Sequence, residues 1–113
     1  MTTKTELGKI DTVKFGLGGY QDAMIGLHFS FSFKGAGVCT SKCAWDAERI
    51  EWSKNCKWTE DDRDKQYAEI IRYLSKLLKE AKVEDVTALK GIPVEVTFED
   101  NTLKSWRILT EVL

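Results

Sequence analysis

The stretch Ile25-Gly26-Leu27-His28-Phe29-Ser30-Phe31-Ser32-Phe33 decides the fold of this chain. Apolar side chains occupy every second position and alternate with glycine, histidine and serine, which is the period-two pattern of a β-strand. One face of that strand therefore carries three phenylalanines, and it has to be covered by a helix or by another subunit. The opposite face is small and polar, so that another molecule can lie close against it.

Turn signals after this strand predict that the chain folds back on itself. Lys34-Gly35-Ala36-Gly37 predicts a hairpin turn, and residues 38–45 predict the returning strand. A further short strand is predicted at residues 49–54, after a turn at residues 46–48. Together with residues 12–33, these segments make the N-terminal half of the protein a group of strands.

A second group of strands is predicted at the C-terminus. Residues 94–98 alternate between apolar and polar side chains, Asp100-Asn101 supplies a turn, and residues 103–113 predict the returning strand. The segment Gly91-Ile92-Pro93 separates this pair from what precedes it. The C-terminal part of the chain is therefore predicted to be a β-hairpin.

A helix is predicted between the two groups of strands. Thr59 resembles an N-cap, because its hydroxyl can accept a backbone N–H bond and three acids follow it. After it, apolar residues recur at helical spacing and form one stripe: Tyr67, Ile70, Ile71, Leu74, Leu77, Leu78 and Ala81. We therefore predict an α+β fold, in which a mostly antiparallel sheet packs on one long amphipathic helix from about Glu60 to about Ala81 and the chain closes with the C-terminal β-hairpin. The stripe is the natural cover for the phenylalanine face.

Length and composition describe one globular domain of ordinary size. The chain has 113 residues, of which 42% are hydrophobic, and its 17 basic and 18 acidic residues give a net charge of −1. This balance disfavours binding to nucleic-acid polymers or membrane surfaces through bulk positive charge. We predict a polar N-terminal lead-in at residues 1–11 and a single α+β domain at residues 12–113.

The sequence predicts neither a membrane segment nor an export signal. No run approaches the ~18 consecutive apolar residues of a membrane-spanning helix, and the first six residues include no apolar stretch. We therefore expect the protein in the cytoplasm, without a membrane partner. Cys39, Cys43 and Cys56 would stay reduced there.

Residues that could carry covalent chemistry are few. His28 is the one histidine, and no serine or cysteine lies in a motif that marks a nucleophile, so we predict that the protein is not an enzyme. His28 and the three cysteines would make a reasonable zinc ligand set, but the strand between Cys39 and Cys43 separates them by roughly 13 Å. We interpret the cysteines as free thiols and predict neither a metal nor a cofactor.

Glycines concentrate in the first third of the chain, where two bends are rich in them. The first covers residues 15–22 and ends in Tyr20, Gln21 and Asp22, and the second is the cationic bend at residues 34–37. Because glycine lets backbone N–H groups approach an anion closely, both bends are candidates for contact with phosphate. Tight turns with positive φ angles are the alternative explanation for the same glycines.

A tryptophan and an arginine stand together in the last predicted strand. Trp106 is a candidate for stacking on a base and Arg107 for gripping a phosphate, with Asn101 nearby. Packing in the core or between subunits is the alternative for Trp106, and an internal acid such as Asp22 or Glu95 is the alternative partner for Arg107. The residues predicted to bind a ligand are Phe15, Gly18, Gly19, Tyr20, Gln21, Asp22, Gly35, Ala36, Gly37, Asn101, Trp106 and Arg107.

Four segments give the chain a family resemblance. Residues 18–24 (GGYQDAM), 57–63 (KWTEDDR), 90–98 (KGIPVEVTF) and 103–111 (LKSWRILTE) resemble a family of small proteins widespread in phage and prophage genomes. The chain is further similar to the first-described family of anti-Thoeris proteins, phage sponges that sequester a cyclic ADP-ribose isomer made by host TIR enzymes. The resemblance covers most of the chain from about residue 13 onward.

This resemblance implies a non-enzymatic phage anti-defence protein that traps a cyclic nucleotide immune signal in the infected host cell. Members of that family bind glycocyclic ADP-ribose, some also hold cyclic di- or trinucleotides at a separate site, and they form homo-oligomers from dimers up to hexamers. It also implies that the Gly35-Ala36-Gly37 bend and Arg107 lie in the ligand pockets. A net charge of −1 suits a compact phosphate compound better than a polymer.

Two other functions fit the same sequence. The first is a phage inhibitor that acts by protein–protein contact with a host defence complex, through the exposed helix face and the acidic residues at 60–62 and 99–100. Short acid runs between basic residues are usually plain solvated surface. The second is binding of single-stranded nucleic acid on a sheet with aromatics, which the negative net charge disfavours.

Overall fold

A computed structural model describes residues 2–46 and 59–113 of the chain. The strand predicted at residues 49–54, like Cys56 and Trp58, lies outside the described residues. The described elements are β1 (Thr3–Gly18), the 3-10 turn η1 (Tyr20–Asp22), β2 (Met24–Phe33), β3 (Ala36–Trp45), α1 (Glu60–Ala81), the 3-10 turn η2 (Val86–Leu89), β4 (Pro93–Glu99), β5 (Thr102–Ile108) and the 3-10 turn η3 (Thr110–Val112).

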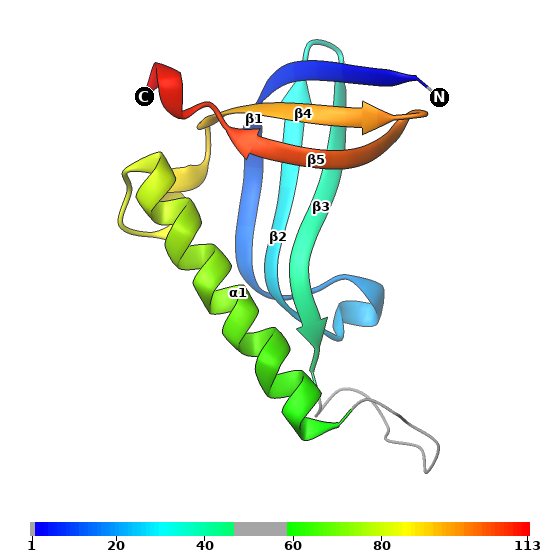
Figure 1. The fold of residues 1–113 in the computed structure, drawn as a ribbon, viewed down its shortest axis with the longest axis vertical. Helices are drawn as coiled ribbons and strands as arrows, with labels where there is room; N and C mark the ends of the chain where they lie inside the picture. The colour runs from blue at the N-terminus through cyan, green and yellow to red at the C-terminus, as the bar shows by residue number, and fades with distance from the viewer. Residues whose placement is uncertain (1, 47–58) are drawn as a thin grey trace.

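The strands form one antiparallel sheet in the order β3-β2-β1-β4-β5. The long strand β1 belongs to both halves of it: Lys9 to Gly18 pair with β2, and Thr3 to Lys9 pair with β4. Where the two halves meet, the register of β1 against β2 shifts between Ile10 and Thr12, and such a bulge bends a strand and increases its twist. Figure 1 shows β1 turning there from the direction of β2 and β3 into that of β4 and β5, so the sheet is curled.

The N-terminal residues differ from their prediction. Residues 3–11 were expected to be a polar lead-in, but they are paired backbone in the middle of the sheet order. Most of their side chains are exposed, including Leu7 with 65% of its surface accessible. Backbone pairing with β4 holds this segment, and little side-chain burial accompanies it, so hydrophobic periodicity could not mark it as a strand.

The core lies on the concave face of the curled sheet. Leu27, Phe29 and Phe31 of β2 are buried there, as predicted from the alternating stretch, together with Val94 and Val96 of β4. Two elements cover the phenylalanine face. Helix α1 contributes Leu77 and Ala81, and β5 contributes Trp106. Its ring centroid lies 5.2 Å from that of Phe29 and 4.8 Å from that of Phe31. Curling therefore lets one end of the sheet cover the other.

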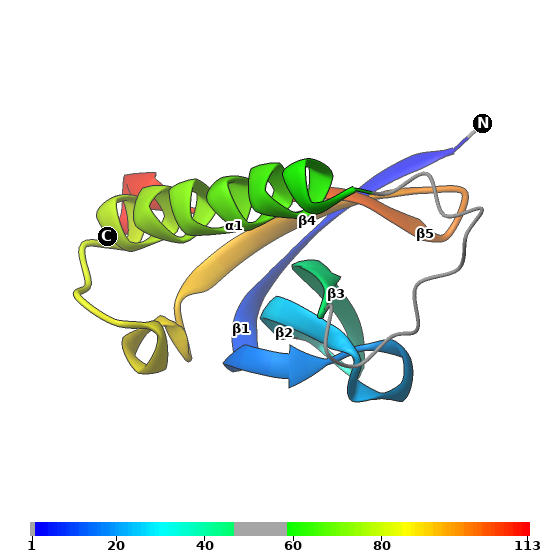
Figure 2. The ribbon, with the colours of Figure 1, turned by 90° about the horizontal axis from the view of Figure 1, so that it is seen from below.

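The helix has the predicted bounds, and its capping explains where it starts. Thr59 and Asp62 form a capping box, in which each side chain accepts the backbone N–H of the other residue, and Lys82 ends the helix in a left-handed conformation. Figure 2 shows α1 lying along one side of the curled sheet. The predicted stripe is only partly buried: Ile70, Leu77 and Ala81 are buried, whereas Ile71 is 54% exposed.

The C-terminal hairpin matches its prediction, apart from the end of its second strand. β4 and β5 pair from Val94↔Ile108 to Glu99↔Thr102, and the strand predicted to reach residue 113 stops at Ile108. The residues after it form the short turn η3. None of the helices in residues 2–46 and 59–113 has the length and apolar character that crossing a membrane requires.

Candidate functional site

The predicted ligand residues are distributed over both ends of the sheet. Gly18 to Asp22 form the bend that joins β1 to β2, whereas Gly35 to Gly37 lie at the opposite end of β2. Because β2 has ten residues, roughly 33 Å of strand separates the two bends. No compact ligand reaches both bends of one copy.

The bend between β1 and β2 has the conformation of a tight turn. Gly19, Gln21 and Asp22 all have positive φ angles, and the Asp22 N–H donates to the Gly19 carbonyl at 3.2 Å. Gly18 packs against His28, since a Cβ at Gly18 would lie 3.0 Å from the Nε2 atom of that ring. His28 Nε2 also lies 3.2 Å from the Met24 carbonyl oxygen. These contacts favour the structural explanation of the first glycine bend.

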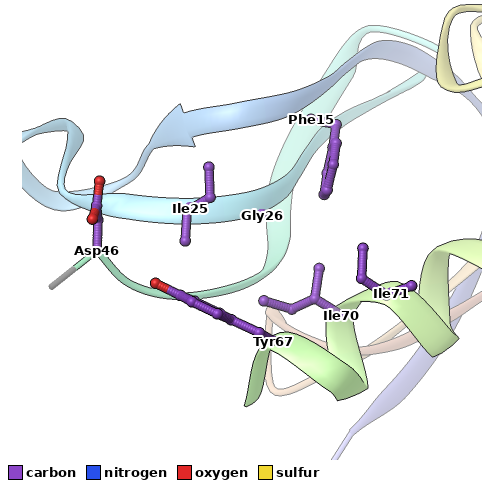
Figure 3. A pocket seen from close by; sticks show the side chains of 7 residues that line it. All are labelled: Phe15, Ile25, Gly26, Asp46, Tyr67, Ile70 and Ile71. Atoms are coloured by element: carbon purple, nitrogen blue, oxygen red, sulfur yellow. The ribbon is translucent and has the colours of Figure 1, made fainter. Parts of the chain in front are cut away.

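Phe15 lines an apolar cleft between the sheet and α1 (Figure 3). The cleft has a volume of about 330 Å³, and its lining residues are Phe15, Ile25, Gly26, Asp46, Tyr67, Ile70 and Ile71. Phe15 is 47% exposed there, and its ring faces Ile70 and Ile71 of the helix. Asp46 is the charged residue among these lining residues, so the cleft suits an apolar group better than a phosphate.

Trp106 and Arg107 lie on opposite faces of β5. Trp106 packs on Phe29 and Phe31 in the core, which favours the packing explanation for this residue. Arg107 is exposed on the other face, where its Nε donates to Glu95 at 3.2 Å and its two terminal nitrogens donate to Glu111 at 3.0 and 2.9 Å. Acids of the same chain are thus the partners of Arg107, and one of them, Glu95, was among the two partners that the sequence predicted.

Titration of Glu111 tests this ion pair. Hydrogen bonds from Arg107 lower the pKa of Glu111 to about 2, from its ordinary value of 4.5. A lowered pKa means that the ion pair stabilises the fold at pH values above 4.5 and that this contribution disappears as the pH falls from 4.5 toward 2. Both groups are exposed, so solvent screening keeps the effect on stability small. In NMR, the carboxyl chemical shift of Glu111 should titrate near pH 2 in the wild type, and its pKa should return toward the ordinary value in Arg107→Ala. Equal pKa values of Glu111 in the two proteins would contradict the pairing.

The second glycine bend and Asn101 come together at one hollow, which we call the turn-end hollow. Its volume is about 330 Å³, and it is lined by Lys4, Glu6, Phe33, Lys34, Ala36, Phe98 and Asn101. It lies between the turn that joins β2 to β3 and the turn that joins β4 to β5. Residues from four strands or their turns thus meet at one place, although they are distant in the sequence.

Two local features position the aromatic part of this hollow. Gly8 of β1 has no side chain, and a Cβ there would lie 2.6 Å from Cδ1 of Phe33, so the glycine leaves room for the Phe33 ring. The rings of Phe33 and Phe98 meet edge to face, with centroids 5.8 Å apart. The hollow therefore has a preformed aromatic wall.

The β4–β5 turn and the N-terminus position the polar part. Asp100 and Asn101 both have positive φ angles, which is the geometry of a two-residue hairpin turn. The Thr2 N–H donates to Asp100 Oδ1 at 2.9 Å, and the Asp100 N–H donates to the Thr2 carbonyl at 2.8 Å. These bonds fasten the start of β1 to the turn and bring Lys4 beside Asn101.

Two lysines and one glutamate give the hollow a net positive charge. Lys4 Nζ lies 2.8 Å from Glu6 Oε1, and the hydrogen bond and charge of Glu6 raise the pKa of Lys4, so it stays protonated. Lys34 is exposed, and no salt bridge among the described residues includes it. The ammonium group of Lys34 is thus available to an anion, next to aromatic rings and an amide.

Sequence reasoning missed several residues of this hollow. Lys4, Glu6 and Gly8 belong to the segment expected to be a lead-in, and Phe33 and Phe98 were expected simply as sheet residues. The signal that would have found the first three is the pairing of β1 with β4, which depends on residues near the C-terminus. Ala36 of the second glycine bend and Asn101 were each predicted as ligand residues, but nothing in the sequence predicted that the two would line the same hollow.

The cysteines and His28 do not gather into a metal site in the described residues. No group of three or more potential metal ligands occurs there. Cys39 is exposed and Cys43 half-buried, both as free thiols, and the Cys43 thiol lies 3.9 Å from the Met24 sulfur.

No family model matches the chain, and neither a curated protein nor a solved structure matches it. The resemblance to phage proteins stays a prediction. A functional assignment therefore depends on residues and geometry, and the turn-end hollow is the place where predicted ligand residues, free positive charge and half-buried aromatic rings coincide.

Proposed function

We propose that the protein is a non-enzymatic binder that sequesters a compact cyclic nucleotide signal, with glycocyclic ADP-ribose as the first candidate, and that the turn-end hollow holds it. The observation that carries this proposal is the meeting of Lys34, Asn101 and the Phe33–Phe98 ring pair around one hollow. A nucleotide offers the matching groups, because it has an anionic phosphate, a polar sugar and a flat apolar base. The role as a phage anti-defence sponge rests on the family resemblance described above.

Each part of the ligand has a counterpart in the hollow. Lys34 can approach a phosphate, and the open backbone at Gly35, where a Cβ would meet nothing within 4 Å, leaves space beside it. The wall formed by Phe33 and Phe98 can pack against a base. The Asn101 amide can donate to one oxygen and accept from another group. Sequestration requires only tight equilibrium binding, so no catalytic group is needed.

The hollow has the size of a small ligand pocket. Its volume of about 330 Å³ lies at the small end of ligand pockets, which begin at about 300 Å³. A second hollow of about 430 Å³ shares Phe33 and Lys34 with it and continues along Leu7, Gly8, Lys9, Ser32, Pro93 and Leu109. Phe33 and Lys34 thus border both hollows.

Calorimetric titration with glycocyclic ADP-ribose, and separately with a cyclic dinucleotide, tests this proposal. We expect Lys34→Ala to weaken binding about tenfold, because it removes a charge-assisted contact worth roughly 1.5 kcal/mol. Lys76→Ala is the matched control, since Lys76 is an exposed lysine of α1 outside the hollow and should bind like the wild type. Absence of binding to both ligands by the wild type would refute the proposal. An equal loss of affinity in Lys34→Ala and Lys76→Ala would mean that the ligand does not bind in the turn-end hollow.

A second candidate function has its own supporting observation. The apolar cleft leaves Phe15 and Ile71 about half exposed, which suits inhibition of a host complex by protein–protein contact. Capture of host proteins by wild type, Ile71→Glu and the surface control Lys76→Glu distinguishes this function. A stoichiometric partner lost only with Ile71→Glu would favour it over the sponge.

A further inference from the structure

A polar hollow of about 370 Å³ lies on the convex face of the sheet, and we call it the convex-face hollow. Two rows of side chains line it from β1, β2 and β3, which run side by side in Figure 1. Each row consists of residues opposite one another in paired strands, and such residues project from the same face. The rows are Lys14–His28–Ser41 and Thr12–Ser30–Cys39. Among the described residues, none lines both this hollow and the turn-end hollow, so its ligand is independent of the function proposed above.

Positive charge in the convex-face hollow comes from Lys14. This lysine is exposed, and none of the salt bridges in the described part of the chain includes it. No aspartate or glutamate is found among the described residues that line the hollow, and His28 adds a second basic side chain directly opposite Lys14. A hollow lined by groups of one sign attracts ligands of the opposite sign, so this one favours an anion.

The Thr12–Ser30 pair supplies a neutral hydrogen-bond donor. Beside the register shift of β1, the Thr12 N–H donates to Ser30 Oγ at 3.1 Å, and the two hydroxyl oxygens lie 2.6 Å apart. Two hydroxyl groups carry two hydrogens, of which one lies between these oxygens. The second hydrogen is left to donate outward, whichever of the two residues carries it. An anion accepts such a hydrogen, whereas a cation cannot use it.

The ring of His28 is oriented by a bond to the backbone. Its Nε2 atom lies 3.2 Å from the Met24 carbonyl oxygen, which can only accept, so Nε2 carries a hydrogen. In the neutral ring Nδ1 is then an acceptor, and in the protonated ring it becomes a donor. Lys14 of β1 and Cys39 of β3 are the other titratable side chains among the described lining residues. Protonation of His28 therefore adds both a charge and a donor to the hollow.

The shape of the lining disfavours a nucleobase. Phe29 is the one phenylalanine, tyrosine or tryptophan among the described lining residues, and it is buried in the core with 3% of its surface accessible. The aromatic wall that the turn-end hollow offers to a base thus has no counterpart here. Gly19 of the first glycine bend also lines the convex-face hollow, which agrees with the phosphate contact predicted for that bend.

We propose that the convex-face hollow binds a phosphate group, either the free ion or the monoester of a small polyol. Lys14 provides the cation for this group. The Thr12–Ser30 pair donates its free hydroxyl hydrogen, and His28 donates from Nδ1 when it is protonated.

NMR titration of the amide resonances with inorganic phosphate, and separately with ribose 5-phosphate, tests this site. We expect the amides of Gly19, Ser30 and Ser41 to shift in the wild type. Lys14→Ala should weaken binding about tenfold, because it removes a charge-assisted contact. Lys9→Ala is the matched control, since Lys9 is an exposed lysine of the same strand that does not line this hollow, and it should bind like the wild type.

The two probes distinguish the two sources of the phosphate group. Tighter binding of ribose 5-phosphate would identify an ester as the ligand, and equal binding would identify the free ion. Unshifted amides with both probes, or unchanged affinity in Lys14→Ala, would overturn the proposal. Shifts confined to Lys34 and Asn101 would also overturn it, while supporting the turn-end hollow as the anion site.

Sulfate titrations at about pH 8 and about pH 6 test the part of His28, because imidazole gains its proton in this range and sulfate keeps its charge. We expect the affinity for sulfate to rise several-fold at the lower pH in the wild type and in the control Cys39→Ser. The affinity should stay constant in His28→Gln, whose amide can still donate to the Met24 carbonyl. A wild-type affinity that does not change with pH, or an equal rise in His28→Gln, would overturn the assignment of His28 to the anion site.

Discussion

Gly26→Ala is expected to lower the free energy of unfolding by about 3 kcal/mol. Gly26 lies in β2 with a φ angle of 149°, and a Cβ there would lie 2.6 Å from the Cα of Cys43 and still closer to the Lys42 carbonyl oxygen. These neighbours are backbone atoms of β3, so relief requires β3 to move away from β2 as a unit. Denaturant unfolding of wild type and variant, followed by circular dichroism, measures the difference.

Gly35→Ala is the control for conformational strain alone. Its φ angle of 78° also favours glycine, but a Cβ at Gly35 would meet nothing within 4 Å. We therefore expect a loss of about 1 kcal/mol, which is the range for a left-handed residue without a clash. Equal losses in Gly26→Ala and Gly35→Ala would mean that the close approach of β3 to β2 is not important for stability.

Trp106→Ala is expected to destabilise the fold by about 3 kcal/mol or more. The indole of Trp106 packs on two rings of β2, and it is the contact through which β5 covers the phenylalanine face. Its removal leaves a gap between the two halves of the curled sheet, and closing that gap would require β1 to bend further. The free energy of unfolding and the near-ultraviolet circular dichroism of the tertiary structure should both fall.

Arg107→Ala is the matched control at the next position of the same strand. Its side chain lies on the exposed face, where it forms hydrogen bonds with Glu95 and Glu111. We expect a melting temperature close to that of the wild type at neutral pH, since exposed ion pairs contribute little. A loss comparable to that of Trp106→Ala would contradict the assignment of the two side chains to opposite faces.

Local signals in the sequence were sufficient for the elements that local interactions stabilise. The capping residue Thr59 and the stripe up to Ala81 predicted the helix with its observed bounds, because helix bonds join residues near in sequence. The hairpins around Lys34-Gly35 and Asp100-Asn101 were predicted for the same reason. The pairing of Thr3–Lys9 with β4 has no local signal, since its partners lie near the other end of the chain.

The difference between local and non-local interactions also explains how much of the candidate site could be predicted. The bend at Gly35 to Gly37 and Asn101 were predicted from turn chemistry, but only the curl of the sheet brings them to one hollow with Lys4. For Trp106 and Arg107 the sequence left two explanations open, and alternation along β5 decides between them. Adjacent residues of a strand point to opposite faces of the sheet, so Trp106 and Arg107 cannot both line one pocket on one face.

Because β1 pairs with both β2 and β4, its two halves find their partners at different times during synthesis of the protein. As the chain leaves the ribosome, the C-terminal half of β1 soon meets β2, but Thr3–Lys9 must wait until β4 has been made. The N-terminal segment of a nascent chain therefore remains an unpaired strand edge while the residues between β1 and β4 are made. Hydrogen-bonded closure of the sheet is a late, non-local event, of the kind that slows folding and exposes intermediates to aggregation. An N-terminal fusion partner is thus expected to affect the yield of folded protein more than a C-terminal one.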